Sequence, residues 1–356
     1  MTAWLDFPDP TIRATLLPEP GRRPYYIVAP AYTRASVGVR CLHLLAHWLN
    51  RLGQSAWVVV CNDGVTLGTN PELATPELTL AIHDHHVSSG QAPIVVYPET
   101  IAGNPLRAAA VIRYVLNFPG LLGGDRSFPP DELVFGFSHA LAEAVGAPEN
   151  VLHLPALDTT VFSPEPVVPR DGTCHYLGKY SRTHGGQAFR LPAGSVEIPS
   201  DPAAMDQSTI ASIFRRSDLF YTYENTGLVV EAGFCGCPVV MMPNAWLTAS
   251  IAEQEFGRDG IAWGDSEEEV ARARATVGRT RERYLRTVVD FFPQLERFVA
   301  QTQARARAVT EPAPLLFDGL PVSSTLYSLP TKTLRRRLAG RVRTLAGRLG
   351  IRETDS

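Results

Sequence analysis

A strand, a polar loop and a short helix follow one another in the segment of this chain with the clearest potential for chemistry. The apolar run over residues 219–223 predicts the strand, and residues 228–234 predict the helix. Free N–H groups at the start of such a helix, together with the positive end of its dipole, suit a phosphate or diphosphate group. Asn225 and Thr226 can cap the helix and contact the same ligand. The complete loop is Glu224, Asn225, Thr226 and Gly227.

A second acidic residue, Glu231, lies inside the predicted helix among apolar neighbours. This setting favours burial, and a buried carboxylate needs hydrogen-bonding partners. A carboxylate accepts two hydrogen bonds in the geometry that the vicinal hydroxyls of a ribose present. Because Glu224 and Glu231 are about two helical turns apart, we expect both carboxylates on the same face of the helix. The alternative for Glu231 is a solvated position on the helix surface.

Strands and helices alternate along the chain, which predicts two successive α/β halves with parallel sheets. In the first half we expect strands near residues 25–30, 56–61, 94–97 and 132–137, and helices over residues 37–52, 106–117 and 138–145. In the second half we expect strands near residues 174–179, 196–198, 219–223 and 238–242, helices over 209–216 and 228–234, and long helices over 267–309. Open parallel sheets bind ligands beyond the carboxyl ends of their strands, so two facing sheets create a cleft.

Proline and turn-forming residues interrupt the alternation over residues 154–164, with the sequence LPALDTTVFSP. Pro166 to Pro169 extend the break. At 356 residues, the chain also exceeds the length that one hydrophobic core usually organises. We therefore expect an N-terminal domain over residues 1–155, a second domain over residues 156–310, and a linker with a tail over residues 311–356.

The net charge and the amino-acid composition argue against several classes of function. The formal net charge of -3, with 45% hydrophobic and 19% charged residues, fits a folded protein and gives no global reason to expect nucleic acid as a partner. No apolar run approaches the roughly 20 residues that span a bilayer. Five cysteines and no signal-peptide pattern lead us to expect reduced thiols in the cytoplasm. Cys235-Gly-Cys237 has no second pair to complete a zinc site, so we expect buried structural thiols there.

The basic, amphipathic stretch over residues 332–352 is the exception to this even charge distribution. Its apolar positions Leu334, Leu338, Val342, Leu345 and Leu349 line one face of a predicted helix. An apolar stripe among many arginines predicts an interfacial helix that docks on anionic lipid, which would make the protein peripheral on the inner face of the plasma membrane. The alternative is a solvated terminal helix that packs on the body of the protein.

The segment over residues 217–240 resembles retaining glycosyltransferases of the GT-B type, in the family 4 or group 1 superfamily. That family shows a glutamate, seven residues, a second glutamate followed by alanine, a small-residue turn, Gly-x-Pro and an apolar strand. Glu231-Ala232 and Gly236-Cys237-Pro238 match directly, which aligns Tyr223 with the first glutamate and leaves Glu224 one residue later. The resemblance implies that Glu231 holds the ribose and that Glu224 or Tyr223 stands at the sugar-contacting position.

Other segments extend the resemblance over most of residues 25–300. Residues 154–164 look like the family's interdomain segment. The sequence YLGK at residues 176–179, with Gly178, resembles the opening strand of the family's nucleotide domain, whose following loop supplies cations to the diphosphate. Lys179 and Arg182 are therefore implied to neutralise the leaving group. The sequence SVGVR at residues 36–40, with Gly38 and Arg40, resembles the glycine-containing loop that approaches the donor phosphate and the acceptor.

Two further stretches contain candidates for the cleft. Glu99 and Asn104 belong to YPETIAGNPL, residues 97–106, which is similar to cleft loops of polysaccharide-building transferases; turn and capping roles are the alternative. The cluster HDHH at residues 83–86 has zinc-binding side chains. Neighbours at such spacing rarely converge on one ion, so we expect a loop or cleft position for His85 and no metal site.

The resemblance implies an α/β fold with two Rossmann-like domains that face each other across a cleft, followed by the amphipathic tail. It also implies transfer of a sugar, with retained configuration, from a nucleoside diphosphate sugar to a hydroxyl of a glycan or lipid-linked acceptor, without metal or other cofactor. Assembly of a surface polysaccharide is the expected setting. Two alternatives remain: a sugar-nucleotide epimerase of the same fold, and a catalytically silent, membrane-associated scaffold, which Tyr223 at the glutamate position would suit.

Overall fold

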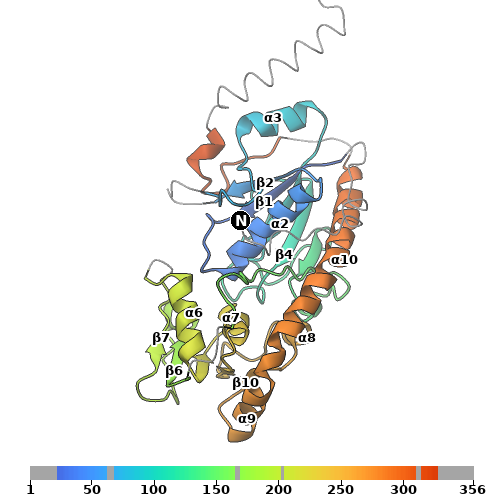
Figure 1. The fold of residues 1–356 in the computed structure, drawn as a ribbon. Coiled ribbons are helices and arrows are strands. Elements are labelled where there is room, and N and C mark those ends of the chain that lie inside the picture. The colour runs from blue at the N-terminus through green and yellow to red at the C-terminus, as the bar shows by residue number, and fades with distance from the viewer. Residues whose placement is uncertain (1–21, 62–67, 165–168, 202–203, 310–313, 328–356) are drawn as a thin grey trace, which may run out of the picture.

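Two parallel five-stranded sheets organise the chain (Figure 1). The computed structural model describes residues 22–61, 68–164, 169–201, 204–309 and 314–327. The first sheet has the strand order β2-β1-β3-β4-β5, and the second has the order β10-β9-β8-β6-β7. All paired strands run parallel. The predicted α/β fold with two Rossmann-like halves is confirmed, whereas the predicted tail over residues 332–352 lies outside the described residues.

We call the parts built on the two sheets the first and the second domain. The first contains β1 (Tyr25–Ala29), α2 (Val37–Arg51), β2 (Ala56–Val60), α3 (Leu80–Ser88), β3 (Ile94–Pro98), β4 (Ala110–Val115), β5 (Leu133–Gly136) and α4 (His139–Ala144). The second contains β6 (Thr173–Tyr176), α5 (Gly178–His184), β7 (Val196–Glu197), α6 (Gln207–Arg216), β8 (Leu219–Thr222), α7 (Leu228–Phe234), β9 (Val239–Met241), α8 (Glu253–Phe256), β10 (Ile261–Trp263) and α9 (Glu267–Thr276). The short helix η2 (Val277–Arg279), the long helix α10 (Thr280–Arg307) and the short helix η3 (Ser324–Tyr327) follow.

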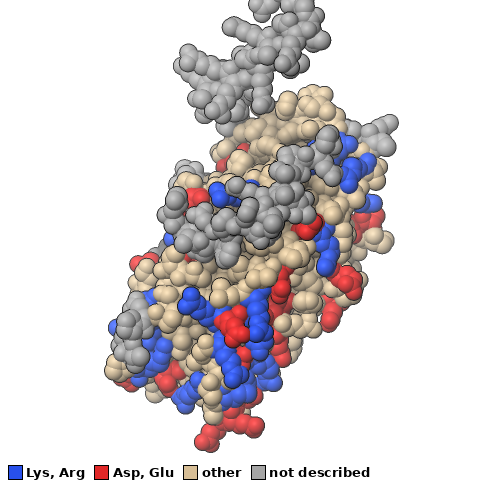
Figure 2. Space-filling model, turned by 45° about the vertical axis from the view of Figure 1, so that its right-hand side comes forward, with Lys and Arg blue, Asp and Glu red and all other residues tan. Residues whose placement is uncertain are grey.

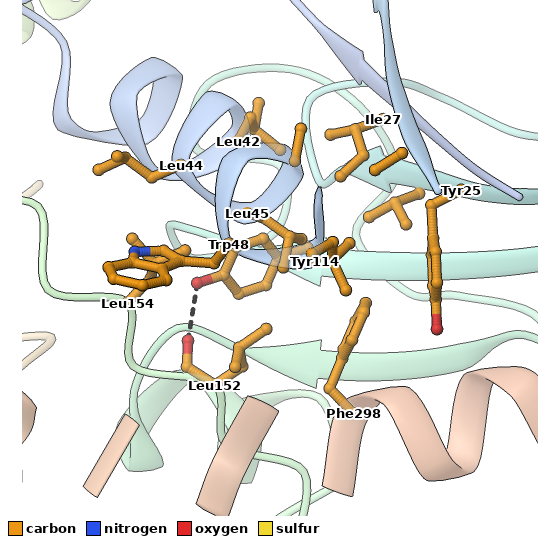
Figure 3. Close-up of a cluster of buried hydrophobic side chains, with 14 of the residues drawn as sticks. Tyr25, Ile27, Leu42, Leu44, Leu45, Trp48, Tyr114, Leu152, Leu154 and Phe298 are labelled. Carbon is orange, nitrogen blue, oxygen red and sulfur yellow. Dashed lines mark hydrogen bonds between the residues drawn. The ribbon is translucent and has the colours of Figure 1, made fainter. Parts of the chain in front are cut away.

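Helix α2 starts at a serine cap and turns its apolar face into the core of the first domain. The Ser36 hydroxyl oxygen accepts a hydrogen bond from the N–H of Val39, which satisfies one of the donors that a helix start leaves free. Trp48 lies in the buried cluster beneath the helix together with Tyr114 of β4 (Figure 3). The Tyr114 hydroxyl donates to the carbonyl oxygen of Leu152 at 2.7 Å. Cap and core together fix the start of α2 at the edge of the sheet.

Helix α10 belongs to both hydrophobic cores. Tyr284 and Val288, near its N-terminus, pack in the cluster of the second domain. Phe291 and Phe298, further along, pack in the cluster of the first domain, where the Phe298 ring lies 6.1 Å from that of Tyr25 (Figure 3). Figure 1 shows the helix in orange along the side of both sheets. The domain limits near residues 155 and 310 stay a prediction, because one helix serves both halves.

The prediction of a helix over residues 106–117 is wrong, since residues 110–115 form β4 between β3 and β5. All six residues of this strand, AVIRYV, are buried. A central strand of a parallel sheet is covered on both faces, so it lacks the alternation of apolar and polar residues that identifies a half-exposed strand. Its β-branched and aromatic residues are the signal that favours a strand.

Helix α3 is absent from the prediction, and the expected loop position for His85 is therefore wrong. The helix begins after a Thr79 cap, and its sequence LAIHDHHVS has no clear apolar face. His86 faces the sheet, where its Nδ1 lies 2.8 Å from the Tyr26 hydroxyl oxygen. His83 Nε2 accepts from the N–H of Leu315 at 3.0 Å. The histidines of α3 thus hold the helix between the first sheet and residues 314–327.

The free energy of unfolding is expected to decrease as the pH falls from 7 to 5. Burial, with smaller effects of His85 and His83, lowers the pKa of His86 to about 4, whereas an unfolded histidine takes up its proton near a pKa of about 6.5. The stabilisation is therefore complete above pH 6.5 and declines below it, by less than about 1.4 kcal/mol per pH unit, because solvent screening reduces the effect below this limit for one proton. Denaturant titrations at pH 7, 6 and 5 measure this slope.

A matched pair of variants assigns the slope to His86. His86→Gln should reduce the pH dependence, whereas His85→Gln, on the exposed face of the same helix, should leave it unchanged. An equal slope in the wild type and His86→Gln would contradict the assignment.

Candidate active site between the two domains

A cavity of about 710 Å³ lies between the two domains. Its walls are residues that follow the carboxyl ends of the strands in both sheets. Open parallel sheets bind ligands at this edge. From the first domain come residues 30, 33–42, 98–100, 116–117 and 137, and from the second domain residues 176, 179, 182, 198–201, 205–208 and 224–231, among others.

Most of the residues predicted for the site line this cavity. They are Gly38, Arg40, Glu99, Lys179, Arg182, Glu224, Asn225, Thr226, Gly227 and Glu231. Four other predicted residues do not line it: Gly178, Tyr223, Asn104 and His85. The topology therefore brings together side chains from five separate loops and helix starts.

A buried ion pair joins the two domains at one wall of the cavity. Arg40 Nη2, on α2, donates to Glu231 Oε1, on α7, at 2.6 Å. The two side chains are only 6% and 3% exposed. The solvated position considered for Glu231 is therefore wrong, and its partner is a cation of the opposite domain. Removing either member of such a pair leaves an uncompensated buried charge, which typically destabilises a protein by about 3–5 kcal/mol.

Glu224 lies in the loop before α7, so the expectation that its carboxylate shares a helix face with Glu231 is wrong. Its Oε2 accepts a hydrogen bond from the N–H of Tyr180, in the first turn of α5, at 2.9 Å. Gly178 allows this approach, because it has a φ of +49° and a Cβ there would lie 2.8 Å from Glu224 Cδ. Burial raises the pKa of Glu224, and nearby Lys179 opposes the shift.

Tyr223 is fully buried behind the cavity wall. Its hydroxyl donates to the carbonyl oxygen of Phe189 at 2.6 Å, and its ring stacks on that of Tyr180 at 5.7 Å with an angle of 12° between the planes. These contacts support the loop that carries Glu224. Tyr223 does not line the cavity, so its contacts do not support a catalytic role.

The polar loop before α7 supports the cavity through its own hydrogen bonds. Asn225 Nδ2 donates to the carbonyl oxygen of Ala249 at 2.9 Å, and its Oδ1 accepts from the N–H of Ile251 at 3.1 Å. The Thr226 hydroxyl oxygen accepts from the N–H of Leu228, but the cap residue of α7 is Gly227 and no side chain caps the helix, so the predicted capping by Asn225 and Thr226 is wrong. Asn225 thus holds residues 249–251 against the cavity.

Gly227 lies where α2 and α7 meet. A Cβ on this glycine would come 2.0 Å from Cγ2 of Val37 and 3.5 Å from Arg40 Nη2. The missing side chain therefore lets the starts of the two helices touch. Beside these helix starts, Gln207 Nε2 donates a hydrogen bond to the carbonyl oxygen of Arg34 at 3.0 Å, which joins the two domains.

Glu99 and Asn104 occupy different environments. Glu99 is 3% exposed at the cavity, and its Oε2 accepts from the N–H of Leu116 at 2.9 Å. Burial raises the pKa of this carboxyl. The Asn104 side chain binds the backbone of Ala108 through both its oxygen and its nitrogen, at 2.9 and 2.8 Å. Asn104 thus has the turn-forming role that was its alternative.

Two cations of α5 face the second-domain part of the cavity. Lys179 and Arg182 are three residues apart, so they share one face of the helix. Within the part of the chain that the structure describes, neither side chain forms an ion pair or a hydrogen bond.

Sequence reasoning missed Asp206 and Gln207, which also line the cavity. The pattern Asp206-x-x-Thr209 could have located them, because Asp206 caps a helix by accepting from the N–H of Thr209 at 2.7 Å.

Charges on one face of the molecule are mixed rather than segregated. On the face in Figure 2, basic and acidic side chains lie next to one another over the end of the molecule that the second domain forms. Ion pairs at the start of α10 include Arg283–Asp259 at 2.8 Å and Arg286–Glu282 at 2.5 Å. No described helix is long and apolar enough to cross a membrane, and no three described His, Cys, Asp or Glu side chains could hold a metal ion together.

Comparisons with known proteins find similarity only among solved structures. No protein-family model and no curated protein matches the chain. A glycosyltransferase involved in avilamycin A biosynthesis is 14% identical with a TM-score of 0.45, covering 81% of this chain and 99% of that one. A glycosyltransferase from Rickettsia africae is 10% identical with a TM-score of 0.46, covering 80% and 99%. A protein described as a UDP-N-acetylglucosamine 2-epimerase from Listeria monocytogenes is 12% identical with a TM-score of 0.38, covering 83% and 100%.

Proposed function

We propose that the protein is a glycosyltransferase that moves a sugar from a nucleoside diphosphate sugar to a hydroxyl group of an acceptor. One observation carries this proposal. The cavity between two facing parallel sheets combines two cations of α5, which have no side-chain partner among the described residues, with a buried carboxylate of α7. The cations would bind the negative charge of a diphosphate, and the carboxylate would accept hydrogen bonds from ribose hydroxyls.

Each part of the donor has a partner of matching chemistry. Lys179 and Arg182 would form charge-assisted hydrogen bonds with the diphosphate, and Glu231 would accept a hydrogen bond from a ribose hydroxyl. Glu224, which Tyr180 and the fold hold beside Lys179, would contact the transferred sugar. Glu99, on the first-domain wall, would receive the acceptor.

In the proposed reaction the bond between the anomeric carbon and the diphosphate oxygen breaks, and its electron pair stays on the departing diphosphate. Lys179 and Arg182 stabilise that developing charge. The acceptor oxygen forms the new bond to the anomeric carbon, and its proton passes to an oxygen of the diphosphate. The cavity lies between the domains, so that a closed form excludes water that would otherwise hydrolyse the donor.

The finer parts of the proposal rest on the resemblance of residues 217–240 to retaining family 4 enzymes. They are retention of configuration, a glycan or lipid-linked acceptor, a place in surface polysaccharide assembly, and docking of residues 332–352 on anionic lipid. No metal or other cofactor is needed for this chemistry, because the cations of α5 take the role of a Lewis acid.

Nucleotide binding tests the proposal. Calorimetry of the protein with UDP, GDP, dTDP and ADP, and with their sugars, is expected to identify one nucleotide that binds. Glu231→Gln keeps the shape and one acceptor for Arg40 but removes the charge, so it is expected to weaken binding of that nucleotide at least about tenfold through the charged hydrogen bond that the ribose loses. Glu268→Ala, an exposed position on α9, is the control and should bind normally.

The products then distinguish the rival functions. Sugar transfer to a glycan or lipid-linked hydroxyl, or slow hydrolysis of the donor alone, supports the transferase. Conversion of the donor to a stereoisomer without any acceptor would instead indicate an epimerase. Binding without turnover would favour the silent scaffold, and the absence of binding by every nucleotide would remove the main support of the proposal.

A further inference from the structure

The Arg40–Glu231 pair leaves one polar atom of each partner without a hydrogen bond to the described residues. Arg40 Nε is buried and has no hydrogen-bond partner in the described part of the chain. Glu231 forms its one hydrogen bond to the described residues through Oε1, so Oε2 has none. Buried polar groups are normally satisfied, and an unmet one is unfavourable by about 1–3 kcal/mol. Both side chains line the cavity, so a small rotation that turns the buried Arg40 Nε–H toward the cavity would let a ligand there supply the missing partners.

The chemistry of these two atoms identifies the ligand group. Nε–H is a donor and the carboxylate Oε2 is an acceptor, so the neighbouring positions require a group that can both accept and donate. A phosphate only accepts, and the negative charge of Glu231 would repel it. Two adjacent hydroxyls fit, because one donates to the carboxylate while the other accepts from the guanidinium. The vicinal 2′- and 3′-hydroxyls of a ribose have this arrangement.

The position of Arg40 is fixed by the fold rather than by a flexible loop. The Ser36 cap sets the start of α2 one turn before it. Its Nη2 lies against the start of α7, 3.5 Å from where a Cβ on Gly227 would be. A residue of the first domain therefore reaches into the nucleotide site of the second.

We propose that Arg40 is a second ligand of the donor's ribose, so that the two hydroxyls are shared between Glu231 of one domain and Arg40 of the other. This inference rests on the proposed function, because it specifies how the same site holds its nucleotide. It implies that the ribose site is complete only when the domains are together. It also implies that ribonucleotide donors are preferred over deoxyribonucleotide donors such as a dTDP sugar.

The test compares a nucleoside diphosphate with its 2′-deoxy and 3′-deoxy forms on the full-length protein. Whichever of UDP, GDP and ADP binds the wild type serves as the probe, and calorimetry measures each Kd. The wild type should bind each deoxy form about tenfold more weakly, because each lacks one charge-assisted hydrogen bond. Arg40→Gln keeps one nitrogen as a donor for Glu231 but lacks the second nitrogen, Nε, and the positive charge. It should lose discrimination against one deoxy form and retain it against the other.

The outcomes separate this inference from the proposed function. If no nucleotide binds the wild type, the proposed function fails first. If the nucleotide binds and Arg40→Gln still discriminates against both deoxy forms, Arg40 serves only to join the domains, and the inference is overturned. Tighter nucleotide binding by Arg40→Gln would overturn it too, because Arg40 would then compete with the ribose for Glu231.

A second variant keeps the test decisive if Arg40→Gln does not fold. Arg40→Lys retains the positive charge beside Glu231 but replaces the planar fork by one nitrogen. The discrimination against one of the deoxy forms should then shrink at least about threefold, while the thermal unfolding midpoint stays close to that of the wild type. Unchanged discrimination by Arg40→Lys would count against the inference.

Discussion

Replacing Phe298 with alanine is expected to lower the free energy of unfolding by about 3–5 kcal/mol. The Phe298 side chain is fully buried, and its ring lies 6.1 Å from that of Tyr25 and 4.8 Å from that of Phe135. The truncation removes these contacts and leaves a cavity that the surrounding strands can close only in part. Denaturant titration followed by circular dichroism measures the change.

The control for this prediction lies on the same helix. Val289→Ala removes an apolar side chain from α10 at a position that is 70% exposed, and should change the free energy of unfolding by less than about 0.5 kcal/mol. Similar effects of the two substitutions would mean that α10 does not contribute to the core of the first domain. Hydrogen exchange adds a local readout, because Phe298→Ala should increase exchange mainly in β1 and β5.

Replacing Gly227 with alanine is expected to separate the two domains while leaving each of them folded. The new Cβ would lie 2.0 Å from Cγ2 of Val37, which is far inside van der Waals contact, so α2 and α7 have to move apart. The movement also pulls Arg40 away from Glu231. We expect nucleotide affinity to fall at least about tenfold and the radius of gyration from small-angle scattering to increase, with an unchanged circular dichroism spectrum.

Two further variants show whether the steric contact is responsible. Val37→Ala in the Gly227→Ala background removes the clashing methyl group and should restore both compactness and most of the affinity. Gly278→Ala adds a methyl group where no atom lies within 4 Å, and should behave as the wild type. A compact Gly227→Ala protein with normal affinity would contradict the role of this contact.

Sequence patterns predicted most elements of the fold because their signals are local. Strand β1 is a short apolar run that ends at Pro30, and α2 has helical spacing after a serine. Strand β4 and helix α3 were mispredicted because neither has a clear periodic alternation of apolar and polar residues. The strand is buried on both faces and has no polar face, whereas the helix turns histidines toward the sheet and residues 314–327 and has no clear apolar face, so neither shows a periodic pattern.

The residues that line the cavity at the ends of strands could be predicted from the expected sheet topology. The carboxyl ends of parallel strands converge, so Glu99, Lys179 and Glu224 were expected near one another, and all three line the cavity. The pairing of Arg40 with Glu231 was not predictable, because 191 residues separate them and only the meeting of α2 with α7 brings them together. The direction of Glu224 likewise depends on the N–H of Tyr180 in the first turn of α5.

The path of α10 has a consequence for the order in which the protein is made. The core of the first domain needs Phe291, Leu295 and Phe298, yet the ribosome adds these residues only after the whole second sheet. The N-terminal half is translated first, but it completes its folding last because it has to wait for α10. Until Phe298 emerges, the nascent first domain exposes the apolar surface that α10 later covers, and this surface is a natural target for a chaperone.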